Sequence, residues 1–224
     1  MIKIVIIGGR GTAIVIADQI NDAKERFGIK IEVLGLALDD LSGGNEISGY
    51  PIICGTHDIM DKFGKYKDIK FIYSLYRPDL MEERTALLYS YDIPANKFTN
   101  FIHPSVMVSR SVKMGIGNVI LANTIINSNF IMGNFNTINS LCLLGHDSQI
   151  GDNNYFAAAT NLGSGVKIGN KNFFGLNSTI RNGLTIGDTC IIAMASNVVK
   201  DIEDRKIVLG NPAKEKEKLN NIIR

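Results

Sequence analysis

Three histidines are the side chains of this sequence best suited to moving a proton near neutral pH. His57 precedes a predicted helix and His103 precedes a proline, so a structural role accounts for each. His146 is followed directly by Asp147. A carboxylate beside a histidine can hold the ring and favour its charged form as a proton arrives. The sequence leaves open whether the two side chains meet directly or through water or backbone, because adjacent residues point in different directions.

A glycine turn and an acidic pair form a second group of interest. The turn, Gly8 to Gly11, follows an apolar run at 2–7 and precedes a helix-like stretch at 12–27. A second apolar run at 31–38 leads to Asp39 and Asp40. This strand, turn, helix, strand order predicts a βαβ unit, which places the turn and the acidic pair where open α/β sheets bind ligands.

We therefore predict a small Rossmann-like α/β domain over residues 1–98, with a further strand at 69–75 and a helix at 79–91. Its short length favours a nucleotide over a dinucleotide. The residues expected to bind that nucleotide are Gly8, Arg10, Gly11, Thr12, Asp39 and Asp40. Alternative interpretations remain, because glycine turns also occur in sheets that bind nothing and both aspartates would serve as turn formers.

The second half of the sequence, which positions His146, has a period of six. Every sixth residue from Ile102 to Val198 is apolar, 17 in succession, which chance would produce on the order of once in a million. Glycine follows many of these residues, either because a corner is crowded or because φ is positive. Compact side chains such as Thr124 and Cys142 come four residues after the apolar position and suit a narrow interior. Each hexad thus predicts one short strand and one corner, and the coils stack into a solenoid.

Composition excludes several classes of protein. The chain has 224 residues, is 45% hydrophobic and carries a formal charge of +2, so neither a polyanion nor nucleic acid is an expected partner. Its apolar stretches are much shorter than the roughly 20 residues of a bilayer span, and no export signal precedes them, so no membrane association and a cytoplasmic location are expected. The three cysteines lack metal-type spacing, and packing explains them.

The repeat resembles the hexapeptide-repeat family. That resemblance implies a domain at residues 99–224 that consists of a left-handed parallel β-helix, with 18 residues per coil, and a C-terminal tail. It also implies a homotrimer, with acetyl-CoA bound between neighbouring helices. With its first hundred residues, the chain resembles bacterial acetyltransferases of nucleotide-activated amino sugars or of sialic acid. The likeness rests on the glycine turn, the aspartate pair, and the segments INSLCLLGHDSQIGD at 138–152, VKIGNKNFFGLNS at 166–178 and VLGNPAK at 208–214.

The resemblance also implies roles for individual residues. His146 becomes the general base, assisted by Asp147, and Asn139 lies near the acceptor amine. The residues implied for the acetyl-CoA groove are Tyr155, Leu176 and Met194. The chain departs from its relatives at Tyr155 and Thr12, where many relatives have histidine, and at Leu75 and Tyr76, where many have a Gly-Asn pair.

The expected activity is acetyl-CoA-dependent N-acetylation of a nucleotide-linked amino sugar by direct transfer, without a metal. Cys142, at an interior repeat position without a paired base, is a poor nucleophile. The alternatives are O-acetylation of a sialic-acid-like sugar, a zinc hydratase and a non-catalytic binding protein. The hydratase would need three histidine ligands, and the repeat contains only His103 and His146. The nucleotide base, the sugar and the position acetylated are not determined by the sequence.

Overall fold

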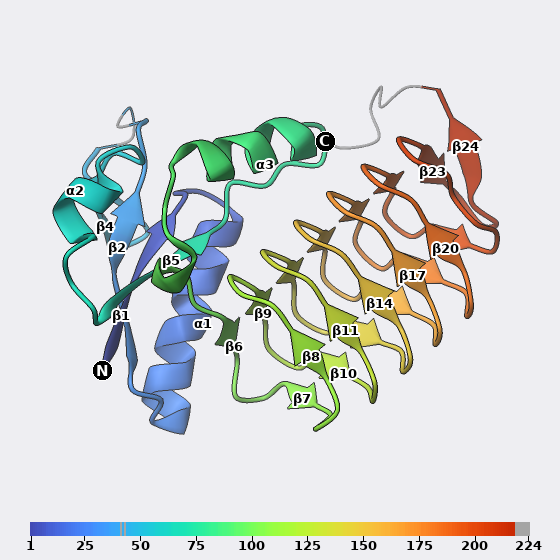
Figure 1. The fold of residues 1–224 in the computed structure, drawn as a ribbon, viewed down its shortest axis with the longest axis horizontal. Helices are drawn as coiled ribbons and strands as arrows, with labels where there is room; N and C mark the ends of the chain where they lie inside the picture. Colours follow the sequence, from blue (N-terminus) through green and yellow to red (C-terminus); the bar gives the residue numbers. More distant parts are fainter. Residues whose placement is uncertain (41, 43, 218–224) are drawn as a thin grey trace.

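A computed structural model describes residues 1–40, 42 and 44–217 (Figure 1). Its first part is a five-stranded sheet in the order β3-β4-β2-β1-β5. The strands are β1 (Ile2–Ile7), β2 (Ile31–Ala37), β3 (Glu46–Ile47), β4 (Tyr50–Cys54) and β5 (Ile69–Tyr73). The helices are α1 (Thr12–Phe27), α2 (Ile59–Phe63), α3 (Met81–Ser90) and a short 3₁₀ helix, η1 (Ala95–Lys97). All pairs in this sheet are parallel except β3 with β4.

The alternation of side chains along β1 explains the layers around this sheet. Ile4 and Ile6 face α1, whose buried stripe of Ala13, Ile16, Ala17, Ile20 and Ala23 recurs at helical spacing. Val5 and Ile7 face the opposite side, where they pack with residues of α2 and α3. The expected unit at 2–38 is therefore present, and α1 has the predicted bounds. The helix expected at 79–91 is shorter at both ends, and the helix expected after His57 is α2. Strands β3 and β4 were not predicted from the sequence.

The second part is a parallel β-helix with three faces, each defined by one sheet. The first face contains β6 (Phe101–Ile102), β9 (Val119–Ile120), β12 (Thr137–Ile138), β15 (Tyr155–Phe156), β18 (Phe173–Phe174), β21 (Ile191–Ile192), β23 (Ile207–Leu209) and the antiparallel β24 (Lys214–Lys216). The second contains β7 (Met107–Val108), β10 (Ile125–Ile126), β13 (Leu143–Leu144), β16 (Asn161–Leu162), β19 (Thr179–Ile180) and β22 (Asn197–Val198). The third contains β8 (Lys113–Met114), β11 (Ile131–Met132), β14 (Gln149–Ile150), β17 (Lys167–Ile168) and β20 (Thr185–Ile186).

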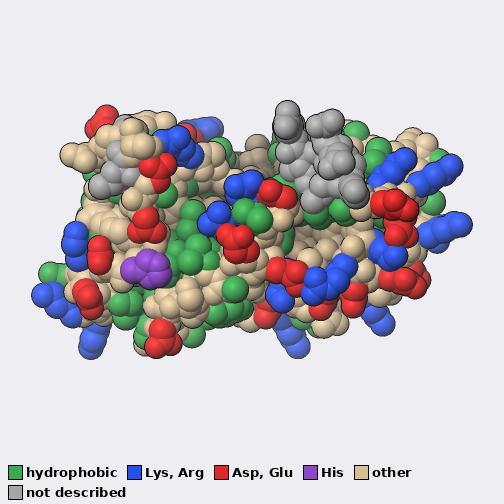
Figure 2. All heavy atoms as spheres, turned by 90° about the horizontal axis from the view of Figure 1, so that it is seen from above, with side chains coloured by type: hydrophobic (Ala, Val, Ile, Leu, Met, Phe, Trp, Pro, Cys, Tyr) green, Lys and Arg blue, Asp and Glu red, His purple; other side chains and the backbone are tan. Residues whose placement is uncertain are grey.

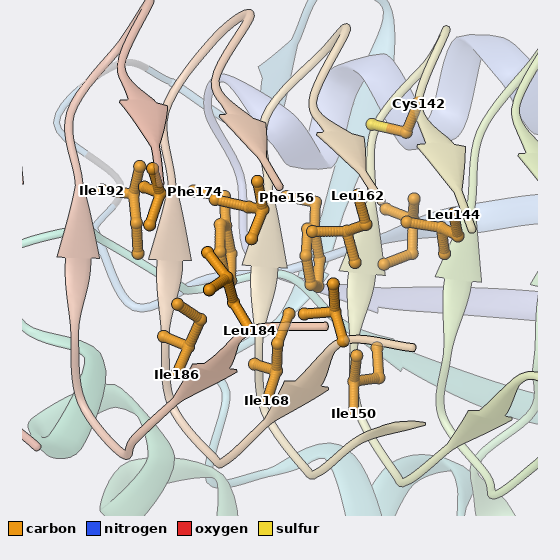
Figure 3. Packing of buried hydrophobic residues seen from close by; sticks show 14 of the residues in the cluster. Cys142, Leu144, Ile150, Phe156, Leu162, Ile168, Phe174, Leu184, Ile186 and Ile192 are labelled. Atoms are coloured by element: carbon orange, nitrogen blue, oxygen red, sulfur yellow. The ribbon is translucent and has the colours of Figure 1, made fainter. Parts of the chain in front are cut away.

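The core of the β-helix is the predicted apolar column. Leu144 pairs in register with Leu162, 18 residues later, so three hexads complete a coil. Figure 3 shows residues such as Phe156 and Phe174 pointing into the space that the coils enclose, and their rings stack 4.4 Å apart. The compact positions are interior as expected, since Thr124, Cys142, Thr160, Val166, Ser178, Cys190 and Ser196 are all buried.

The structure decides between the two explanations for the repeat glycines. A Cβ at Gly145 would overlap the backbone of Gly163 in the next coil, and the φ of Gly145 is not positive. Crowding between coils therefore explains these glycines. Positive φ recurs instead three residues after the apolar position, for example at Asn129 (58°) and Asp147 (57°).

The two parts share their apolar cores. The outward side chains of Phe101 and Val119, on the first face, pack against α1, while Phe135 packs with the layer that contains α2 and α3. Glu82, in α3, forms an ion pair with Arg205 near the end of the β-helix, with an N–O distance of 2.7 Å. The N-terminal part therefore packs against the first face of the β-helix, and α3 extends toward the end of the β-helix.

The surface carries charges of both signs. Figure 2 shows acidic and basic side chains intermingled over the visible face, as expected from the net charge of +2. None of the helices in the described part of the chain has the length and apolar character of a bilayer span.

Candidate active site

His146 and Asp147 occupy the corner between the second and third faces, after β13 and before β14. His146 Nδ1 lies 2.6 Å from Asp147 Oδ2, so the contact between the side chains is direct. The positive φ of Asp147 explains it, because the backbone turns there instead of alternating as in a strand. A carboxylate can only accept, so Nδ1 of the neutral ring donates and Nε2 keeps a free lone pair. The imidazole is 55% exposed and thus accessible to a ligand.

Asp147 is held in its charged form. A hydrogen bond from Asn129 Nδ2, 2.8 Å from Asp147 Oδ1, is the largest cause that lowers the pKa of this carboxyl below its usual value. The hydrogen bond from His146 is the second cause. The carboxylate is therefore ionised near neutral pH and available to stabilise a positive imidazolium.

A pocket of about 390 Å³ opens at the carboxyl ends of β1, β2 and β5. Gly9 and Arg10 of the glycine turn line it, together with Asp40. Gly11 lies in the same turn with φ 62° and has no atom within 4 Å of a Cβ built on it, so its outer side is open. The volume falls within the range of small-molecule sites.

Two arginines at this pocket were missed by the sequence reasoning. Arg77 and Arg84 line it with Arg10, although they come after β5 and from α3. Arg77 is bound to Asp79, at 2.8 Å, whereas the buried Nε of Arg84 has no hydrogen-bond partner among the described residues. Only the position of Arg77 just beyond a predicted strand offered a signal, because strand ends converge at this edge.

The aspartate pair is divided by the structure. Asp40 lines the pocket, with Arg10 at 4.0 Å. Asp39 instead accepts hydrogen bonds from the backbone N–H and the hydroxyl of Thr56, at 2.7 and 2.6 Å. The carboxylate of Asp39 therefore holds the loop after β4, and it lines a neighbouring pocket.

The three residues expected at the acetyl-CoA groove fall in two places. Leu176 and Met194 occupy equivalent positions of successive coils, on the corner between the first and second faces, and are 53% and 55% exposed. Asn139 lies at the same corner and donates from Nδ2 to the carbonyl of Phe156. Tyr155 lies on the first face, where its hydroxyl meets Thr12 of α1.

A single chain does not unite these groups. The glycine turn contacts the first face through Thr12 and Tyr155. His146 lies at the corner between the other two faces, which is the corner opposite the first face in a three-sided coil. The pocket lined by Arg10 and the His146 corner of one chain therefore lie on different sides of the β-helix.

The remaining histidines and thiols have structural surroundings, as expected. The buried His103 contacts Asp22 through Nε2 and Ser105 through Nδ1, at 2.9 and 2.8 Å, and His57 packs edge-to-face with Tyr91. All three cysteines are buried and unpaired with one another, and burial raises the pKa of Cys142 to about 12. The described residues contain no group of three or more potential metal-binding side chains.

Comparison with known proteins gives a clear result for structures only. No family model and no curated protein matches the sequence. A histidine-to-asparagine variant of perosamine N-acetyltransferase from Caulobacter crescentus, in complex with CoA and GDP-perosamine, matches with a TM-score of 0.80 and 25% identity, over 96% of this chain and 97% of that one. The acetyltransferase domain of PglB from Neisseria gonorrhoeae, in complex with acetyl coenzyme A, matches with a TM-score of 0.81 and 21% identity, over 96% and 98%.

WeeI from Acinetobacter baumannii matches with a TM-score of 0.79 and 22% identity, over 96% of this chain and 100% of that one. The PglB domain and WeeI are informative about the fold alone. The likeness covers both the N-terminal sheet and the β-helix in every case, and it confirms the resemblance expected from the sequence.

Proposed function

We propose that this chain, an acyltransferase of the hexapeptide-repeat sugar N-acetyltransferase family, transfers an acetyl group from acetyl-CoA to the amino group of a nucleotide-linked sugar. The observation that carries the proposal is the match along the whole chain to an enzyme whose structure contains CoA and GDP-perosamine. The exposed imidazole of His146, held by Asp147, adds the base that such a reaction requires.

The chemistry assigned to His146 is proton transfer. An ammonium has no lone pair with which to attack a thioester, so Nε2 of His146 removes a proton from the acceptor nitrogen. The neutral amine nitrogen bonds to the acetyl carbon and the carbon–sulfur bond breaks. Of the two protons that the nitrogen loses, one passes through His146 to the departing thiolate of CoA and the other is released to solvent. The negative charge of Asp147 stabilises the imidazolium formed between these steps. No covalent acyl-enzyme is required.

We assign residues 1–98 to a Rossmann-like domain that binds the nucleotide. Its pocket contains Arg10, Arg77 and Arg84, and guanidinium groups suit a diphosphate because they present several donors to its oxygens. The open side of Gly11 allows a ligand to approach the backbone at the start of α1. The identities of the nucleotide base and of the sugar are tested by the substrate screen.

We assign residues 99–224 to a domain made of a left-handed β-helix and a C-terminal tail, which assembles as a homotrimer. The last part of this assignment, residues 218–224, lies outside the described residues. Met107, Ile125 and Leu143 are neighbours on the outer side of the second face, and all three are exposed in one chain. A second copy would cover this apolar row and would bring the His146 corner of one chain toward a pocket of another. Leu176 and Met194 would then contact acetyl-CoA. Sedimentation should give about 73 kDa, three times 24.5 kDa, and an active monomer would contradict the assembly.

The direct test is a screen of UDP-, dTDP- and GDP-linked amino sugars with acetyl-CoA, in which the release of free thiol is followed. We expect release with one class of amino sugar, an N-acetylated product by mass spectrometry, and little release without an acceptor. Sialic-acid-like acceptors form the second arm, and an O-acetylated product there would replace the proposed acceptor. Binding of acetyl-CoA with no transfer to any acceptor would indicate a binding protein.

A further inference from the structure

Asn129 lies one coil before the histidine–aspartate pair, on the same corner between the second and third faces. It follows Ile126 of β10 by three residues, as Asp147 follows Leu144 of β13, and both have positive φ. The backbone N–H of Asn129 donates to Ser111 Oγ, at 2.8 Å, one coil further back. Its side chain is thereby directed along the stack of coils toward Asp147.

The two oxygens of Asp147 have different partners. Oδ1 accepts from Asn129 Nδ2, at 2.8 Å, and Oδ2 accepts from His146 Nδ1, at 2.6 Å. Among the described residues, no other side chain bonds this carboxylate. Asp147 is 56% exposed, and an exposed carboxylate that loses one partner turns readily toward water. The amide of Asn129 therefore fixes the plane in which Oδ2 faces the imidazole.

The orientation of this carboxylate decides which ring nitrogen is free. While Oδ2 accepts from Nδ1, the neutral ring carries its hydrogen on Nδ1 and its lone pair on Nε2. If the carboxylate turns away, both tautomers of the ring become populated and the lone pair is divided between the two nitrogens. The hydrogen-bonded series Asn129, Asp147, His146 thus determines how much of the ring is ready to accept a proton at Nε2.

We propose that Asn129 is a positioning residue for His146, acting through Asp147. Its effect on catalysis depends on the proposed acetyl transfer, but its effect on the ring tautomer does not. The conformation of Asn129 is not by itself the evidence, since asparagine is common at positive φ. The evidence is the hydrogen bond from the side chain of Asn129 to Asp147. An asparagine that has a positive φ but lacks such a bond is therefore a suitable control.

Asn123 is the matched control residue. It has φ 60°, and its backbone N–H donates to Ser105 Oγ at 2.9 Å, as that of Asn129 does to Ser111. Its side chain forms no hydrogen bond with the part of the chain that the structure describes. Asn129→Gly and Asn123→Gly both keep a residue suited to positive φ, so both variants should fold with similar melting temperatures.

The first measurement is ¹⁵N NMR of histidine side chains in the full-length protein without ligands, at a pH where the ring is neutral. With three histidines in the sequence, the spectrum of His146→Gln identifies the signals of His146. We expect a protonated Nδ1 and an unprotonated Nε2 in the wild type and in Asn123→Gly, and mixed tautomers in Asn129→Gly. An unchanged tautomer in Asn129→Gly, or the same change in Asn123→Gly, would overturn the proposal.

The second measurement is a double-mutant cycle on kcat for acetyl transfer. Asn129→Gly should lower kcat about 3- to 10-fold, the value of one hydrogen bond to a charged group at an exposed site. In the background of Asp147→Asn it should have no further effect, because the carboxylate it orients is gone. Additive losses would show that Asn129 acts independently of Asp147 and would overturn the proposal. Absence of any acetyl transfer by the wild type would reject the proposed function while leaving the NMR result to decide the role of Asn129.

Discussion

Thr12 Oγ1 and the hydroxyl of Tyr155 share a hydrogen bond of 2.9 Å, which joins the first residue of α1 to the outer side of β15. The ring of Tyr155 also stacks on Phe173, with the planes inclined by 10°. Both Thr12 and Tyr155 are positions at which the family resemblance led us to expect a histidine. The structure therefore connects two departures that seemed unrelated, and it ties the glycine turn to the β-helix.

Tyr155→Phe should raise the KM for the nucleotide sugar about 2- to 10-fold, because a lost hydrogen bond is worth about 0.5 to 1.5 kcal/mol. The KM for acetyl-CoA should stay unchanged. Thr12→Val should have the same effect, and the double variant should be no worse than either single one. Steady-state kinetics with each substrate varied separately measures this. A change confined to acetyl-CoA would instead place Tyr155 in the cofactor groove, as the family resemblance implies.

Gly11→Ala should raise the KM for the nucleotide sugar roughly tenfold, because the added methyl group enters the open space from which a ligand approaches. Gly28→Ala is the control, since Gly28 at the end of α1 also has positive φ, 69°, and open surroundings. Both variants should lose about 1 to 2 kcal/mol of unfolding free energy from backbone strain. If Gly28→Ala weakens sugar binding equally, strain rather than ligand contact is responsible.

His146→Ala should lower kcat by roughly 10²- to 10⁴-fold, the usual contribution of a general base. Its melting temperature should be close to that of the wild type, because the exposed ring makes no contribution to the apolar column that includes Leu144. Near-native turnover of this variant at saturating sugar would show that another group is the base.

Asp147→Asn should lower kcat, but by less than His146→Ala does. Asp147 is ionised throughout the working range, since hydrogen bonds from Asn129 and His146 lower its pKa. The variant loses the charge that stabilises the imidazolium formed during transfer, while the ring that accepts the proton remains. Steady-state kinetics measures this, and a kcat equal to that of the wild type would contradict this interpretation of the pair.

Cys142→Ser should retain kcat within about twofold. Burial raises the pKa of the thiol to about 12, so at pH 8 only about one molecule in ten thousand carries the thiolate needed for a covalent step. Serine should fit, because Thr160 and Ser196 occupy the equivalent interior position in later coils. Loss of turnover in a folded Cys142→Ser protein would favour an acyl-enzyme.

The Cys142 thiol also makes the free energy of unfolding decrease as the pH rises into the alkaline range. Its folded-state pKa, about 12, lies above the reference value of 9.0, so its contribution to stability is complete below pH 9 and is lost between pH 9 and 12. Between pH 8 and pH 10.5 the wild type should lose about 2 kcal/mol more unfolding free energy than Cys142→Ser does. Urea unfolding of both proteins at the two pH values measures this difference. Equal losses in the two proteins would contradict this contribution.

The sequence predicted the solenoid and its interior column, because each hexad contains its own strand, corner and interior residue. It also determined α1, whose apolar stripe and preceding glycine turn are local features. It did not determine β3 and β4, which are short and whose packing is decided by the sheet they join. The six-residue spacing was sufficient to predict the apolar core of the solenoid, whereas the register of 18 residues per coil was expected from the family resemblance.

Only the tertiary structure decided how the candidate site is arranged. The direct bond between His146 and Asp147 depends on a left-handed residue, and the bond from Asn129 depends on the 18-residue stacking of coils. Arg84 lines the pocket that contains Arg10 only because the fold brings α3 to the carboxyl ends of the strands. The pocket and His146 are separated in one chain because the N-terminal part packs on the first face of the β-helix. This packing joins apolar surfaces from distant parts of the sequence, so short-range patterns do not predict it.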